Sequence, residues 1–170
     1  MNLLVNVAEL RRRVGERRPV RAGLVVDDAA IGPVRVPEDD PLDVDVELES
    51  VSGGVAATGR VRGRWAGACR RCLEPVDGSL EVVVDEIFEE RPTDGETYPI
   101  DHDVIDLAPM ARDAVMLALP VGPLCREDCP GPSPERFPVT VADEGAPPPV
   151  DPRWAVLDRL RDSDGGDPLR

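Results

Sequence analysis

Residues 42–66 read LDVDVELESVSGGVAATGRVRGRWA, and this stretch decides the fold. Apolar and acidic residues alternate from Leu42 to Glu49, which is the pattern of a β-strand with one buried and one solvated face. A second alternating segment follows Gly53-Gly54, with apolar and small residues on one face and polar ones on the other. Because glycine accepts the positive φ that tight hairpin turns require, the two segments predict an antiparallel hairpin.

A two-residue turn at Gly53-Gly54 sets a register that satisfies both faces of this hairpin. It places Asp43 opposite Arg64, Asp45 opposite Arg62, Glu47 opposite Arg60, Val46 opposite Val61 and Leu42 opposite Trp65. Each cross-strand ion pair is worth ~0.2–1 kcal/mol. A row of arginines on a strand also fits RNA binding, but arginines with acidic partners favour a structural role. A different register that left them unpaired on an open face would favour RNA.

Weaker patterns predict the remaining elements. Residues 8–14 favour a short helix between Asn6 and Gly15, residues 20–26 and 80–88 favour strands, and residues 90–104 favour a polar loop. Asp106 is a candidate helix N-cap, and Pro120 ends that helix. Its apolar positions are Leu107, Met110, Ala114, Leu117 and Ala118. The sequence therefore predicts an α+β fold, an antiparallel β-sheet or partly open barrel with a few short helices.

Composition along the chain predicts how it is divided. We expect a single α+β domain over residues 1–130, a proline-rich acidic linker over 131–150, a short helix over 151–161 and a disordered tail over 162–170. The short helix puts Trp154, Leu157 and Leu160 on one face, which favours docking on the core or on a partner. The first residues lack the pattern of a secretory signal and no apolar stretch is long enough to span a membrane, so we expect a cytoplasmic protein with reduced thiols.

The four cysteines form two close pairs, Cys69/Cys72 and Cys125/Cys129. Two such pairs can supply the four thiolates of a tetrahedral zinc site. The first pair sits at the tip between two predicted antiparallel strands, the knuckle position that such a site needs. Two alternatives stay open: reduced cysteines without a metal, and a redox-active pair. The redox interpretation lacks the expected helix after Cys72, because Pro75-Val76-Asp77-Gly78 favours a turn.

Charge is distributed unevenly along the chain. The net charge is −14, and all 20 basic residues are arginine. Residues 1–24 hold six arginines and two glutamates, a local charge of +4, which leaves −18 for the remainder. An acidic chain repels polyanions in general and attracts basic partners. The absence of lysine excludes chemistry that needs a lysine amine, such as a Schiff base or a phosphate-loop lysine.

Four motifs in sequence order resemble those of a known family. They are Cys69-Arg70-Arg71-Cys72-Leu73-Glu74-Pro75; Ile105-Asp106-Leu107 running into Leu117-Ala118-Leu119-Pro120; Pro123-Leu124-Cys125 with Cys129-Pro130-Gly131; and Asp151-Pro152-Arg153-Trp154-Ala155-Val156-Leu157 through Leu160. In this order they resemble the YceD-like family, the large ribosomal RNA subunit accumulation proteins, in its actinobacterial form. The resemblance spans about residues 1–161.

The resemblance implies a role in accumulation or maturation of large-subunit (23S) ribosomal RNA, and genetic proximity to the small basic large-subunit ribosomal protein thirty-two. No enzymatic activity is established for the family. Relatives carry the CxxC pair with a Cys or His plus a Cys after the Leu-Pro segment, which supports zinc at Cys69, Cys72, Cys125 and Cys129. Many relatives continue after Gly131 with a further cysteine pair that is missing here, so a second metal site built from it is absent.

Two functions from different classes follow. The first is a non-enzymatic ribosome-biogenesis factor that acts on 23S rRNA or its precursor, with a structural zinc. Its candidate RNA contacts, for which ordinary surface charge is the alternative interpretation, are Arg11, Arg12, Arg13, Arg17, Arg18, Arg70 and Arg71. The second is an acidic adaptor for a basic ribosomal protein such as protein thirty-two, without direct RNA contact. No membrane and no small-molecule substrate is implied.

An enzyme, for instance a nuclease, is the least favoured class. A nuclease usually needs clustered carboxylates around an open metal site. The acids of this chain are spread through strand faces and loops, and a four-thiolate zinc has no open position. We therefore expect no catalytic residues.

Overall fold

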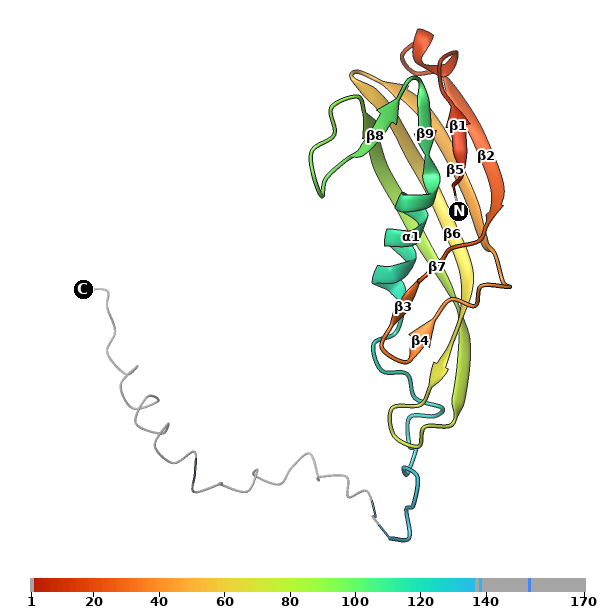
Figure 1. Cartoon of the computed structure of the whole chain (residues 1–170), viewed down its shortest axis with the longest axis vertical. Helices are drawn as coiled ribbons and strands as arrows, with labels where there is room; N and C mark the ends of the chain where they lie inside the picture. Colours follow the sequence, from red (N-terminus) through yellow and green to blue (C-terminus); the bar gives the residue numbers. More distant parts are fainter. Residues whose placement is uncertain (1, 137, 139–152, 154–170) are drawn as a thin grey trace, which may run out of the picture. The chain divides into compact units, whose positions relative to one another are not determined.

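A computed structural model describes residues 2–136, 138 and 153 (Figure 1). The chain divides into two units, Met1–Phe137 and Pro138–Arg170, and every element described here lies in the first. One helix, α1, spans Leu107–Ala118, and a short 3₁₀ turn, η1, spans Leu10–Arg12. The strands are β1 (Leu4–Asn6), β2 (Arg17–Leu24), β3 (Ala30–Ile31), β4 (Val34–Arg35), β5 (Leu42–Val51), β6 (Gly54–Ala68), β7 (Pro75–Glu89), β8 (Tyr98–Asp101) and β9 (Val104–Asp106).

The strands form one open sheet that curls into a half-barrel around α1 (Figure 1). The strand order runs β2-β5-β6-β7-β8-β9-β1, and β4 with β3 pairs along the far half of β6. All pairings are antiparallel except that of β7 with β8. The predicted α+β class, with a partly open barrel, is confirmed. Within the described residues, no helix is long and apolar enough to cross a membrane.

The central hairpin forms, but its predicted register is wrong by two residues. The turn lies at Ser52-Gly53, with Gly53 at φ +98°, so Asp43 faces Arg62 and Asp45 faces Arg60. A shift of two keeps every side chain on its predicted face, because strand side chains alternate with period two. A close approach fixes the register. A Cβ at Gly59 would lie 2.2 Å from the carbonyl oxygen of Asp45, so only glycine fits there.

Arginines and acids alternate across the outer face of the sheet, strand by strand. β2 and β6 carry the arginines, and β5 and β7 carry most of the acids. Arg62 contacts Glu81 at 2.6 Å and Asp43 at 3.6 Å, and its hydrogen bond lowers the pKa of Glu81. Arg64 contacts Asp77 at 2.7 Å. The arginines are therefore paired despite the changed register, and the structural interpretation of this row holds.

The core lies between the inner face of the sheet and α1. Its largest fully buried side chains include Phe88, Leu42, Leu48, Leu107 and Met110. The Asp106 carboxylate accepts from the Ala108 N–H, which confirms the predicted N-cap. The predicted apolar stripe is partly wrong.

The buried stripe of α1 instead follows Leu107, Ala111, Val115 and the capping Leu119, whereas Leu117 is 89% exposed. Residues spaced four apart from Leu107 share one side of the helix, and Leu117, halfway between two of them in sequence, lies on the opposite side.

Two local predictions are corrected. Residues 90–104 are not a continuous loop, because β8 and the start of β9 form a hairpin there, with His102 and Asp103 both at positive φ in its turn. The helix expected over 8–14 is only the single turn η1. Leu10 is its one buried apolar residue and Val14 is 74% exposed, so a second turn would bury nothing.

The predicted helix over 151–161 and the predicted tail over 162–170 lie outside the described residues, apart from Arg153. Most of the predicted linker over 131–150 lies outside them as well. These predictions, and the division of the chain that they imply, stay predictions.

Candidate metal centre

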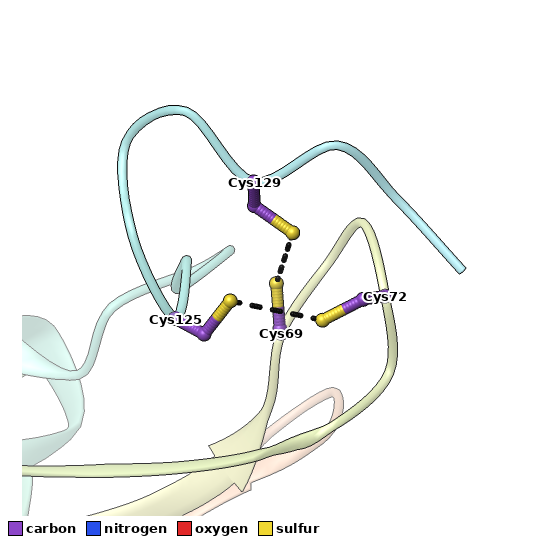
Figure 2. Close-up of side chains that lie close together, drawn as sticks. All are labelled: Cys69, Cys72, Cys125 and Cys129. Carbon is purple, nitrogen blue, oxygen red and sulfur yellow. Dashed lines mark hydrogen bonds between the residues drawn. The ribbon is translucent and has the colours of Figure 1, made fainter. Parts of the chain in front are cut away.

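The four cysteines come from two distant parts of the chain and meet at the tip of the β6–β7 hairpin (Figure 2). Cys69 directly follows β6, and Cys72 lies in the turn that leads into β7. Cys125 and Cys129 lie on the chain that leaves α1. The predicted position of the first pair, at the turn between two antiparallel strands, is confirmed.

The four sulfur atoms lie within 4.8 Å of one another. The Sγ atoms of Cys69 and Cys129 are 3.8 Å apart, and those of Cys72 and Cys125 are 3.7 Å apart. A tetrahedron with metal–sulfur bonds of about 2.3 Å has sulfur–sulfur edges of about 3.8 Å. A disulfide needs about 2.05 Å. The arrangement therefore fits four thiolates around one metal ion, and all four cysteines are free.

Hydrogen bonds hold the two cysteine segments together independently of the sulfurs. The Arg70 N–H donates to the Pro123 carbonyl at 2.9 Å. The Arg71 guanidinium donates to the carbonyls of Cys129 (2.9 Å) and Glu127 (3.2 Å). Arg71 thus spans from the first segment to the second. Sequence reasoning missed this role, because a backbone carbonyl acceptor leaves no pattern in the sequence.

Leu73 completes the first cysteine turn in a conformation that glycine favours. Its φ is +66°, and its N–H donates to the Cys69 carbonyl at 2.9 Å. The left-handed region costs a residue with a Cβ about 1–2 kcal/mol. The Leu73 side chain is 72% exposed, so no packing within the described residues offsets this strain.

The thiols differ in acidity because their surroundings differ. Backbone N–H groups, that of Cys72 foremost and that of Cys125 next, lower the pKa of Cys69 to about 5. Hydrogen bonding with the Cys129 thiol, followed by burial, raises the pKa of Cys125 to about 12. One thiolate therefore forms readily, and further ones are opposed by crowding and burial. A divalent cation removes that obstacle, since thiolates are the form that binds metal.

The candidate RNA-contacting arginines fall into two groups. Arg11 contacts Glu90 and Asp103, Arg17 contacts Glu47 and Glu49, and Arg18 donates to the Asn6 carbonyl. Among the described residues, no ion pair engages Arg12, Arg13 or Arg70, and all three are exposed. The structure does not bring the arginines of residues 11–18 together with Arg70 and Arg71.

Gly15 and Glu16, which follow η1, form backbone hydrogen bonds with Ser50 at the end of β5, next to the start of β6. Arg70 lies just beyond the other end of β6. The 15 residues of β6 separate the two regions by roughly 50 Å, at about 3.3 Å per residue.

Comparison with known proteins identifies the family. The chain matches the model of the family described as large ribosomal RNA subunit accumulation protein YceD over residues 57–161. It is 35% identical over 174 residues to uncharacterized proteins of Mycobacterium bovis and Mycobacterium tuberculosis, covering 91% of this chain and 79% of each relative. An uncharacterized protein of Mycobacterium leprae is 35% identical over 125 residues, covering 69% of this chain and 58% of the relative. No solved structure matches. The match takes in both cysteine pairs, and the chain belongs to the family of the large ribosomal RNA subunit accumulation protein YceD.

Proposed function

We propose that this protein is a non-enzymatic ribosome-biogenesis factor of the cytoplasm that supports accumulation of 23S rRNA and carries a structural zinc ion. The family match supports the first part, because its description names accumulation of large-subunit ribosomal RNA. The sulfur arrangement supports the second and is the single observation that carries it. Four thiolates at tetrahedral spacing suit zinc and leave no position open for a substrate.

The zinc ion acts by fastening the chain that leaves α1 to the tip of the β6–β7 hairpin. Zinc bound by Cys69, Cys72, Cys125 and Cys129 joins two segments separated by 52 residues between Cys72 and Cys125. It keeps Arg70 on an exposed tip. Native mass spectrometry should find one zinc per chain, and Cys129→Ser should lose it. A protein purified without metal and equally stable would contradict the zinc site.

RNA contact, in this proposal, is made at the ends of the domain rather than on the sheet face. The sheet arginines are engaged by acids, and surplus acids would repel phosphate. Arg12 and Arg13 at the end of η1 and Arg70 at the hairpin tip are the strongest of the seven candidates, because they are exposed and form no ion pair among the described residues. Arg11, Arg17, Arg18 and Arg71 are weaker, because their guanidinium groups are engaged.

The test is complementation of a deletion strain, with the ratio of 23S to 16S rRNA as the readout. Arg12→Gln combined with Arg13→Gln should fail to restore the ratio and should weaken rRNA retention with a shallower salt dependence. The matched control is Arg21→Gln with Arg35→Gln, which removes the same charge from exposed strand positions. Equal complementation by both double variants would reject the proposed contact. A normal ratio in the deletion strain would reject the function itself.

A second candidate is the acidic adaptor for a basic large-subunit ribosomal protein, such as protein thirty-two. The net charge of −14 favours it, because such a field attracts a basic protein more readily than RNA. Binding of the purified partner after nuclease treatment is the expected result. Loss of binding on removal of RNA would contradict the adaptor.

A further inference from the structure

A cavity of about 510 Å³ lies between α1 and the segment that leads into β8. Its wall is part acidic and part apolar. Glu86, Asp94, Glu96 and Asp113 form the acidic part, and Ala114 and Leu117 belong to the apolar part. Four of the side chains are carboxylates, and none is basic.

These carboxylates differ from those on the outer face of the sheet. There, acids such as Glu81 and Asp77 lie within 2.7 Å of an arginine. In the cavity, among the described residues, Glu86, Asp94 and Glu96 take part in no ion pair. Asp113 accepts from the Tyr98 hydroxyl at 3.1 Å and has only a distant arginine, Arg112 at 3.8 Å. The cavity thus concentrates negative charge that the protein itself does not neutralise.

The apolar wall gives the cavity its second property. Leu117 projects from α1 and is 89% exposed, and Ala114 lies one turn before it. The Tyr98 ring packs on Phe88 with 5.3 Å between the ring centres, so it is fixed in the wall. Apolar surface next to unneutralised carboxylates complements a side chain that has a hydrocarbon stem and a cationic head.

We propose that this cavity receives an arginine or lysine side chain from a basic segment of a partner protein. The stem lies along Leu117 and Ala114, and the head lies among Glu86, Glu96 and Asp113. Apolar residues adjoining that side chain in the partner cover Leu117. The inference deepens the second candidate function, association with a basic protein, and rests on it. A metal ion is a poorer occupant, because among the described residues only the cysteines come close enough together to ligate one.

The probe is a fluorescein-labelled peptide that alternates arginine with leucine, added to the full chain without RNA and followed by fluorescence anisotropy. The cavity variant is Asp94→Asn with Glu96→Gln. The matched control is Glu38→Gln with Asp39→Asn, which removes the same two charges from an exposed loop away from the cavity. For the apolar wall, Leu117→Gln is compared with Val121→Gln, another exposed apolar residue. None of these residues packs in the core, so all variants should fold.

We expect the cavity variant to weaken peptide binding by about tenfold and the matched control by less than about twofold, since salt screens charges beyond roughly 8 Å. Leu117→Gln should weaken binding, and Val121→Gln should not. Equal losses in the two charge variants would overturn the cavity while leaving the adaptor function standing. Failure of the unaltered protein to bind the peptide would overturn the cavity, whereas failure to bind the purified basic ribosomal protein without RNA would overturn the adaptor function. A peptide with serine in place of leucine that binds equally well would overturn the role of the apolar wall.

Discussion

The two ends of the β6–β7 hairpin are stabilised in different ways. The first half of β6 lies between β5 and β7, and it buries Val55, Ala57 and Val61 under α1 and the curled sheet. The second half has β7 on one side and only the single pairing of Arg35 with Ala66 on the other. Its tip is closed by four sulfur atoms (Figure 2). One hairpin thus has a buried apolar core at one end and a cluster of four cysteines that could hold a metal ion at the other.

The largest expected effect is at the apolar end. Phe88→Ala removes a fully buried ring that packs on Tyr98 and should lower the free energy of unfolding by about 3–5 kcal/mol. The loss should be the same with and without bound metal, because Phe88 lies in the half of the hairpin remote from the cysteines. Urea denaturation in zinc and in chelator checks this. A loss that depends on zinc would show that the two ends are not independent.

The next effect is at the sulfur end. Cys72→Ser should lose the metal and should remove hydrogen-exchange protection from the amides of residues 66–76, while residues 55–61 keep theirs. Chelator applied to the unaltered protein should reproduce this pattern. If Cys72→Ser abolishes protection throughout the sheet, the hairpin is one cooperative unit and the comparison fails.

A smaller effect depends on pH in the metal-free protein. The lowered pKa of Cys69, about 5 against an ordinary value of 9.0, means that the unfolded chain binds a proton at this thiol that the folded chain has released. Stability from this group should therefore be present at high pH and be lost as pH falls from 9 toward 5. Chelator-treated protein should show a lower urea midpoint at the acidic end of this window. The Cys69→Ser variant is the control, and a slope identical to that of the unaltered protein would contradict the prediction.

The smallest effect comes from the strained turn. Leu73→Gly relieves a positive φ, and after the added freedom of the unfolded chain it should raise stability by at most about 1 kcal/mol. Val83 is equally exposed but lies within β7, so Val83→Gly should lower stability. Differential scanning calorimetry of the zinc-loaded proteins would test the pair. If both variants are less stable than the unaltered protein, the backbone strain at Leu73 is smaller than its positive φ implies.

The extent of prediction from sequence differs between local and non-local features. Alternation identified the faces of the central hairpin, but two registers of equal parity satisfied those faces, and the turn chemistry chosen was wrong. The strand β8 was missed because its four residues are too few to show a repeating pattern. It pairs with β7 through Phe88 and Tyr98, and the following β9 pairs with β1. Of these pairings, only that of β9 with β1 joins distant parts of the chain, and such a pairing leaves no local pattern in the sequence.

The clustering of the four cysteines was more predictable than its surroundings. Two cysteine pairs have a spacing with a direct chemical meaning, and the structure places all four sulfurs together. Two features were not predicted: the hydrogen bonds from Arg71 to the second cysteine segment, and the exposure of Leu117. The first depends on carbonyl groups that every residue has. The second depends on which of two apolar stripes the sheet covers, and only the assembled core decides that.

The separation of the two cysteine pairs has a consequence for the order of events during synthesis. Cys69 and Cys72 leave the ribosome long before Cys125 and Cys129. The strands β7, β8 and β9 and the helix α1 are synthesised between the two pairs. The complete set of four ligands exists only after residue 129 has emerged, by which time every strand of the half-barrel has been translated. In the proposed zinc-bound form, the site can therefore be completed only after the whole half-barrel has been translated. A chain interrupted before Cys125 would carry only two of the four clustered cysteines.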